Sequence, residues 1–178
     1  KTLFDSGIET SSLDSRIILK EIFCFNEKQL ILNSQLIVSA KKINEVDKIL
    51  ARRKSGEPIS KIFGKRDFYK SSFLISKDVL DPRSETELII GIANNFILDK
   101  GYKSFIDLGT GSGCIILSIL EDNKSLCALG IDISHEAINI AVKNCKNLNL
   151  EKKATFIVSN WLFPICGLYD LIISNPPY

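Results

Sequence analysis

The segment around residue 110 constrains the fold of this chain more than any other. A short apolar run at 103–108 is followed by a glycine-rich loop and then by an apolar, helix-like run at 114–120. The loop consists of Gly109, Thr110, Gly111, Ser112 and Gly113. Glycines let the backbone approach a ligand closely and the next helix presents free N–H groups, so this order predicts half of a Rossmann-like α/β unit. The G-x-G-x-G spacing is not the G-x-G-x-x-G of dinucleotide binders, and the absence of a Gly-Lys-Ser/Thr ending excludes a P-loop.

Two carboxylates stand at the ends of predicted strands near this loop. Asp107 lies two residues before the first glycine, where it suits a ligand with an ammonium group better than a pyrophosphate. Asp132 ends a second predicted strand, 126–131. An acidic residue about twenty positions past a glycine loop is where a ribose diol is bound. The alternative for Asp132 is a carboxylate that favours the N-terminus of the helix beginning after it.

Two further strand ends carry side chains that suit a ligand. The predicted strand 154–158 leads to Asn160 and to Trp161, the only tryptophan. The indole could flank an adenine while Asn160 bonds the edge of the base, because ligands collect at the carboxyl ends of strands in open α/β sheets. The alternative is that Trp161 packs in the core.

The fourth predicted strand, 169–174, ends in the sequence Asn175, Pro176, Pro177 and Tyr178. Two prolines make a stiff, non-helical turn that holds the Asn side chain in one place. A planar N–H₂ group could donate to the Asn175 oxygen and to a free proline carbonyl, with Tyr178 as a flat apolar wall. Alternatively the turn only ends the strand.

Together the four strand ends resemble a class I S-adenosylmethionine-dependent methyltransferase, and the N-P-P-Y ending resembles enzymes that methylate amide or amino nitrogens. Further segments resemble the HemK-type release-factor glutamine methyltransferases over essentially the whole chain. These are Gly7–Glu9, Leu13–Leu19, Gly56–Gly64, Phe68–Tyr69 and Val79–Glu87. Two departures are Asp81, where the family usually has an apolar residue before Pro-Arg, and Asn160, where it usually has Asp before Trp.

The resemblance implies methyl transfer from S-adenosylmethionine to the side-chain amide of the glutamine in the Gly-Gly-Gln loop of class-1 peptide-chain release factors. Asn175 and Pro176 would act in catalysis, and Pro177 and Tyr178 would complete the substrate site. The residues implied to bind the cofactor are Asp107, Gly109, Thr110, Gly111, Ser112, Gly113, Asp132, Asn160, Trp161 and Asn175. No metal is expected.

Three segments are predicted along the chain. Residues 1–54 have helical spacing of apolar residues and are expected to form a small helical domain that holds the protein substrate. Residues 55–83 are expected to be a linker with a β-hairpin near 70–72, and residues 84–178 a methyltransferase domain. The family plan continues past N-P-P-Y, so the chain is expected to be a fragment whose fourth strand exposes an unpaired edge.

Composition leaves two alternatives open. An adenine-N6 methyltransferase can share N-P-P-Y, but it would need a basic, aromatic-lined channel for a flipped base, and the net charge is only +2. A non-catalytic module that kept the cofactor fold is the other.

Charge and hydropathy also bear on partners and compartment. No apolar run reaches about 18 residues, so a cytoplasmic protein with no membrane partner is predicted. The net charge of +2 gives no strong field for a polyanion, so no nucleic-acid partner is expected. The five cysteines are expected to be reduced packing residues. The basic clusters 41–42 and 52–54 are expected to be solvated, with partner contact as the alternative.

Overall fold

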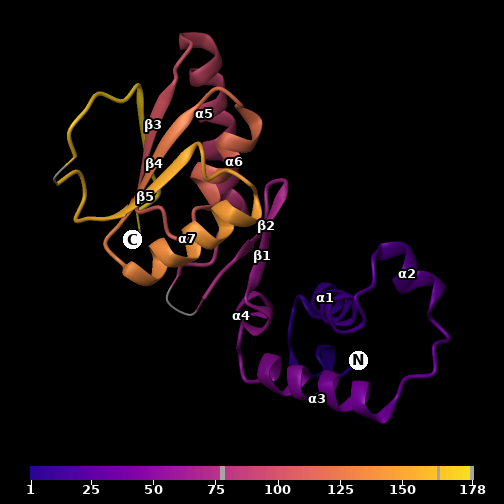
Figure 1. The fold of residues 1–178 in the computed structure, drawn as a ribbon. Coiled ribbons are helices and arrows are strands. Elements are labelled where there is room, and N and C mark those ends of the chain that lie inside the picture. Colours follow the sequence, from indigo (N-terminus) through magenta and orange to yellow (C-terminus); the bar gives the residue numbers. More distant parts are fainter. Residues whose placement is uncertain (77–78, 164, 177–178) are drawn as a thin grey trace. The chain divides into compact units, whose positions relative to one another are not determined.

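A computed structural model describes residues 1–76, 79–163 and 165–176 of the chain. The chain divides into two compact units, Lys1–Gly64 and Lys65–Tyr178. The first unit is built from helices and the second combines a hairpin, a sheet and covering helices (Figure 1). Among the residues described, no helix is long and apolar enough to cross a membrane.

The first unit folds around apolar residues that recur with helical spacing. Its elements are the 3₁₀ turn η1 (Phe4–Ser6) and the helices α1 (Ser11–Phe23), α2 (Glu27–Leu32), α3 (Ala40–Lys54) and α4 (Ile59–Phe63). Leu3, Ile18 and Ile22 are buried at its centre, and side chains of α3 and α4 pack against them. The helix α4 lies within residues 55–83, for which the sequence predicted a linker. The functional division into three segments stays a prediction.

The basic clusters of the first unit are largely engaged within the unit. Arg53 Nε donates to the buried Asp14 carboxylate at 2.7 Å, which ties α3 to α1. Arg52 donates to Glu57, and Lys42 donates both to Glu45 and to the carbonyl oxygen of a residue in α1. Internal pairing of these three cations argues against a large basic docking face on α3.

The second unit begins with the hairpin that the sequence predicted. Strands β1 (Lys65–Phe68) and β2 (Ser71–Leu74) pair antiparallel across the turn at residues 69–70. The 3₁₀ turn η2 (Ser84–Thr86) then leads into helix α5 (Glu87–Lys100).

A four-stranded parallel sheet forms the centre of this unit and confirms the predicted α/β fold class. Its strands are β3 (Ser104–Leu108), β4 (Cys127–Asp132), β5 (Ala154–Val158) and β6 (Leu171–Ser174), in the order β5-β4-β3-β6. Helix α6 (Cys114–Asp122) connects β3 to β4, and α7 (His135–Asn147) connects β4 to β5. Because β4 lies on one side of β3 and β6 on the other, the strand order reverses at β3. Ligands bind at such a switch point, outside the carboxyl ends of the strands.

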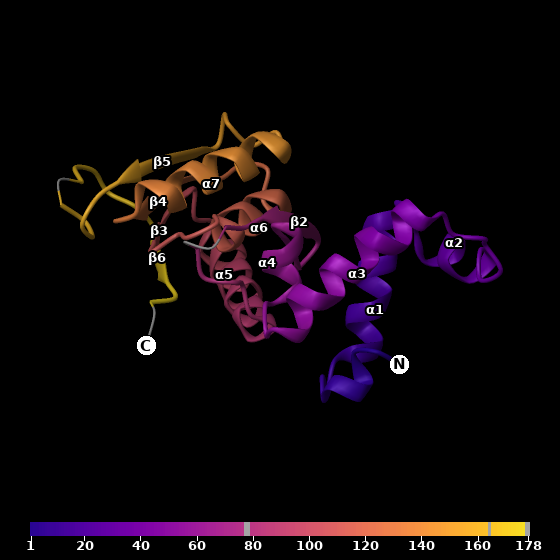
Figure 2. The ribbon, with the colours of Figure 1, turned by 90° about the horizontal axis from the view of Figure 1, so that it is seen from below.

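The two faces of the sheet are covered differently. Helices α5, α6 and α7 lie on one side, where the main core is centred on residues such as Phe105 and Ile116 (Figure 1 and Figure 2). On the other face, a smaller cluster that includes Ile106 and Leu108 packs against side chains of the segment after β5. Alternation along β3 therefore directs Phe105 and Asp107 toward the helical face.

A carboxylate fixes the position of β6 beside β3. Asp170 Oδ2 accepts hydrogen bonds from the N–H groups of Lys103 and Ser104, each at 2.8 Å, and from the Ser104 hydroxyl at 3.0 Å. The backbone donors, Lys103 first, hold the pKa of Asp170 below its ordinary value. The register that follows pairs Leu108 with Ser174, so the turn after β6 starts beside the glycine loop.

Candidate functional site

The glycine loop has a backbone that only glycine adopts easily. Gly109, Gly111 and Gly113 all lie in the left-handed region, with φ of +72°, +56° and +78°. The N–H groups of Gly109 and Thr110 both donate to the carbonyl oxygen of Ile131, at 2.8 and 2.9 Å, which attaches the loop to β4. A side chain on any of the three glycines would strain this backbone. The sequence pattern therefore reports a real conformational requirement.

Asp107 is fully buried under this loop. Its Oδ2 accepts a hydrogen bond from the Thr110 hydroxyl at 2.7 Å, while Oδ1 has no hydrogen-bond partner among the residues described. Burial raises the pKa of Asp107 from 3.8 to about 6. A buried carboxylate oxygen without a partner is costly unless a ligand supplies a donor. The expected contact of Asp107 with an ammonium group stays a prediction.

Asp132 braces the loop from the end of β4. Its Oδ2 accepts from the N–H of Gly111 at 2.9 Å, and its Oδ1 accepts from the N–H of Ser134 at 3.0 Å. The cap of α7 is Ser134, whose hydroxyl oxygen accepts from the Ala137 N–H. Each carboxylate oxygen has two acceptor positions. Asp132 therefore retains the capacity to accept further hydrogen bonds, such as those of a diol.

Asn144 on α7 joins the hairpin to the glycine loop, and sequence reasoning missed it. This side chain is 1% exposed, and its Oδ1 accepts from the Leu74 N–H at 2.7 Å. Its Nδ2 donates to the carbonyl oxygens of Leu74, at 3.0 Å, and of Ser112, at 2.8 Å. An asparagine three positions after the buried Ala141 stands on the apolar face of α7, and that is the signal that would have identified it.

The segment after β5 does not place Trp161 in the core. Trp161 has a φ of +53°, its side chain is 61% exposed, and Asn160 beside it is exposed as well. The alternative that Trp161 is a packing residue is therefore wrong. The proposed contact of Trp161 and Asn160 with a base stays a prediction.

The turn after β6 brings Asn175 to a residue far away in the sequence. The Asn175 side chain is half-buried, and its Nδ2 donates to the Thr86 hydroxyl oxygen at 3.3 Å. The Ser174 hydroxyl donates to the carbonyl oxygen of Leu108 at 3.0 Å, which anchors the turn to β3. Pro176 is exposed. Pro177 and Tyr178 lie outside the described residues.

Strand register brings the predicted site together at one edge of the sheet. Leu108 pairs with Ile131 in β4 and with Ser174 in β6, and Asp132 pairs with Val158 in β5. All four strands run in the same direction, so the loops that follow them emerge at one edge, as the sequence predicted. In the described part of the chain, no group of three or more His, Cys, Asp or Glu residues could hold a metal ion.

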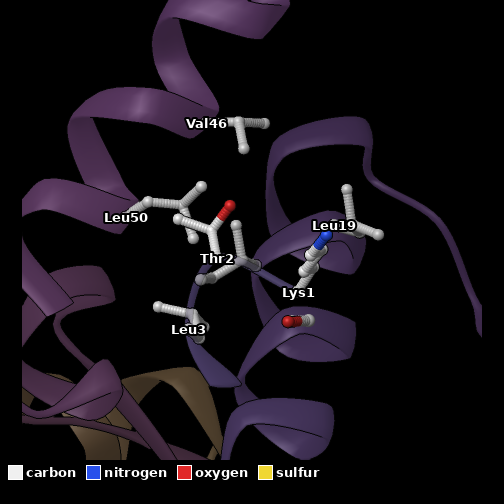
Figure 3. A pocket seen from close by; sticks show the side chains of 8 residues that line it. Lys1, Thr2, Leu3, Leu19, Val46 and Leu50 are labelled. Carbon is white, nitrogen blue, oxygen red and sulfur yellow. The ribbon is translucent and has the colours of Figure 1, made fainter. Parts of the chain in front are cut away.

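One cavity lies elsewhere, in the helical unit. It has a volume of about 170 Å³ and lies between the N-terminal residues, α1 and α3 (Figure 3). Its walls are mostly apolar and include Leu3, Leu19, Val46 and Leu50. None of the predicted site residues lines it.

Comparison with known proteins gives matches over both units. Residues 67–178 match the family model "Methyltransferase small domain", and residues 1–64 match "PrmC N-terminal domain". A release factor glutamine methyltransferase of Rhodospirillum rubrum is 35% identical over 97% of this chain and 53% of its own length. The corresponding protein of Caulobacter vibrioides is 34% identical over 99% of this chain and 61% of its own. Among solved structures, the N-terminal domain of human METTL16 is similar with a TM-score of 0.49 and 22% sequence identity. The match covers 57% of this chain and 44% of the METTL16 chain. The chain thus spans little more than half the length of these two bacterial relatives.

Proposed function

The chain belongs to the methyltransferase small domain family, and from this membership we propose a specific reaction for the protein of which it is part. The protein transfers a methyl group from S-adenosylmethionine to the side-chain amide nitrogen, N5, of the glutamine in the Gly-Gly-Gln loop of class-1 peptide-chain release factors. The observation that carries the proposal is the placement of the glycine loop and the Asn175 turn after adjacent strands, β3 and β6. Relatives named release factor glutamine methyltransferase support the substrate assignment.

The residues around the glycine loop fit S-adenosylmethionine. The unpartnered Oδ1 of buried Asp107 is suited to the ammonium group of the methionine part. Asp132 can accept from the ribose hydroxyls, and Asn160 and Trp161 would contact the adenine. Gly109 and Gly111 leave room for the ligand beside the backbone, whereas Gly113 packs against Ala141 and Leu117. When bound, the cofactor supplies an electrophilic methyl group on a sulfonium centre.

The Asn175 turn would orient the nucleophile. A primary amide nitrogen reacts poorly because its lone pair is delocalised into the carbonyl. Hydrogen bonds from its two N–H groups to Asn175 Oδ1 and to the carbonyl oxygen of Pro176 would hold the nitrogen in line with the methyl group and favour a pyramidal geometry. The amide proton leaves after the nitrogen–carbon bond has formed, so no base is required before the attack. Pro177 and Tyr178 would complete the substrate site.

The proposed substrate also implies which protein is the partner and in which cellular compartment the reaction takes place. The helical unit would hold the release factor, and the protein would act in the cytoplasm, where translation termination takes place. Direct binding of a nucleic acid is not expected, because the net charge of +2 provides no strong electrostatic field to attract a polyanion.

The experiment uses the full-length protein, radiolabelled S-adenosylmethionine and three acceptors: a class-1 release factor, its Gly-Gly-Gln→Gly-Gly-Ala variant, and an adenine-containing oligonucleotide. We expect label only on the unaltered release factor. Asn175→Ala should reduce turnover by about 10²-fold or more and change cofactor affinity far less, since the glycine loop and Asp132 supply most of the cofactor contacts and the orienting contacts of Asn175 act mainly in the transition state. Label on the oligonucleotide would favour the adenine-N6 alternative, and cofactor binding without transfer to any acceptor would favour a non-catalytic module.

A further inference from the structure

The side chain of Asn175 can serve the proposed reaction in only one of its two orientations. A carboxamide has an oxygen that accepts and a nitrogen that donates. The target amide nitrogen also carries N–H groups, so the oxygen of Asn175 must face it. With the nitrogen turned toward the target, donor would meet donor and the orienting hydrogen bond would be lost. A group that accepts a hydrogen bond from the nitrogen end of Asn175 would therefore hold the side chain in the productive orientation.

Thr86 lies at the nitrogen end. Asn175 Nδ2 donates to Thr86 Oγ1 at 3.3 Å, and no hydrogen bond joins Asn175 Oδ1 to any residue that the structure describes. The distance is slightly long, as is common for site hydrogen bonds before the ligand is bound. The contact spans 89 residues of sequence and joins η2 to the turn after β6.

The hydroxyl of Thr86 is available because it does not cap a helix. Thr86 is the N-cap residue of α5, a position where Thr usually accepts a hydrogen bond from the first turn. Here it has a helical backbone, with φ of −67° and ψ of −20°, because η2 runs directly into α5, and its side chain makes no cap hydrogen bond. Its own N–H donates to the carbonyl oxygen of Arg83 at 3.0 Å, which holds the residue in place.

The next residue strengthens this support. Glu87 starts α5, and its Oε1 accepts from the N–H of Tyr69 at 3.0 Å. Tyr69 has a φ of +55° in the turn between β1 and β2. Thr86 therefore directly precedes a helix start that is bonded to the hairpin turn, so its backbone has a defined position.

We propose that Thr86 is a positioning residue for Asn175: its hydroxyl holds the end of the carboxamide that faces away from the nitrogen that is methylated, and the N–H groups of that target nitrogen select the amide oxygen for the other end. This inference rests on the proposed function for its catalytic consequence, whereas the contact itself can be tested without catalysis. Thr86 acts through Asn175 and leaves the glycine loop unchanged. Its loss should therefore affect kcat and leave cofactor binding intact.

The test compares three substitutions in the full-length protein. Thr86→Val keeps the shape and removes the hydroxyl, Thr86→Ser keeps the hydroxyl, and Ser84→Ala removes an exposed hydroxyl from the same 3₁₀ turn as a control. We expect Thr86→Val to lower kcat on the release factor by about 10-fold, with KM and cofactor affinity changed by less than about twofold. Thr86→Ser and Ser84→Ala should both remain within about threefold of the wild-type kcat.

A second measurement reports on the contact without turnover. The side-chain ¹⁵N–¹H₂ signals of Asn175 are assigned by their loss in Asn175→Ala. In Thr86→Val these signals should shift and their hydrogen exchange should accelerate, while Thr86→Ser should preserve them. Thr86→Ala provides the same comparison if Thr86→Val does not fold.

The outcomes distinguish the positioning role of Thr86 from the proposed function. Unchanged Asn175 signals, or a wild-type kcat in Thr86→Val, would overturn the positioning role even if the wild-type enzyme methylates the release factor. Failure of the wild-type enzyme on the release factor would overturn the proposed function, while altered signals in Thr86→Val would still support the contact.

Discussion

Replacing Asn144 with leucine should destabilise the second unit strongly, although the two side chains have similar size. The substitution removes three hydrogen bonds: one from the Leu74 N–H, and two to the carbonyl oxygens of Leu74 and Ser112. A hydrogen bond of this kind contributes about 1 kcal/mol net, and a buried group left without a partner costs about 1–3 kcal/mol. We therefore expect the free energy of unfolding to fall by about 2–4 kcal/mol, a large fraction of the usual 5–15 kcal/mol.

Urea unfolding of the full-length protein, followed by circular dichroism, would measure this loss. Asn139→Leu is the matched control, because Asn139 is exposed on the same helix. The control should change the free energy of unfolding by less than about 0.5 kcal/mol. Asn144→Asp would add a second comparison: it keeps an acceptor for the Leu74 N–H but directs a carboxylate at two carbonyl oxygens, so it should be at least as destabilising as leucine.

The expected loss also has a functional part. Asn144 holds the Ser112 carbonyl, so the glycine loop should become more mobile and cofactor affinity should fall even where the protein remains folded. A loss from Asn144→Leu no larger than that from Asn139→Leu would refute the reasoning, because it would mean that the three hydrogen bonds contribute nothing beyond those made with water.

Three further predictions concern the same edge of the sheet. Burial raises the folded-state pKa of Asp107 from 3.8 to about 6. The contribution of Asp107 to the free energy of unfolding is therefore present below pH 3.8 and is lost as the pH rises through 6. Urea titrations across this pH range should show the wild type losing stability relative to Asp107→Asn. Gly130→Ala should destabilise by about 1–3 kcal/mol, because its Cβ would lie 2.6 Å from the Phe156 ring; the double variant with Phe156→Leu should recover part of the loss in thermal melts. Asp132→Ala should weaken S-adenosylmethionine binding by about 1–3 kcal/mol in calorimetry, since the ribose hydroxyls and the Gly111 N–H both lose their acceptor; unchanged affinity would remove Asp132 from the site.

The backbone conformation of Gly111, more than the space around it, excludes a β-branched residue at this position. Among the residues that the structure describes, a Cβ at Gly111 would meet a Val79 methyl group, at an ordinary 3.7 Å. The φ of +56° is the stronger obstacle, since L-residues with branched side chains rarely adopt it.

The expectation for the cysteines was only partly correct. Cys114 and Cys145 are buried, as expected of packing residues, whereas Cys24, Cys127 and Cys166 are exposed. Short apolar runs around these residues gave no information about which face of the element would be covered. Cys127 is the first residue of β4, where the strand has not yet entered the core.

Features that depend on neighbouring residues could be predicted from the sequence alone. The glycine loop could be predicted because its left-handed conformations exclude other residue types, and the hairpin and the four strands because their patterns repeat over a few positions. The convergence of the strand ends followed from the parallel α/β order alone. Asp132, in particular, was placed correctly beside the loop before any contact was known.

Which distant groups meet depends on how the helices and strands pack, and the sequence patterns did not predict it. The hydrogen bonds of Asn144 span 70 and 32 residues, and the contact between Thr86 and Asn175 spans 89. Such pairings depend on the position of β6 beside β3 and on the packing of the hairpin against α7, which no local pattern records. The same packing removes water from Asp107 and raises its pKa. Local conformation is encoded by residue type and by the periodic spacing of apolar residues. Burial and long-range hydrogen bonds exist only once the helices have packed against the sheet.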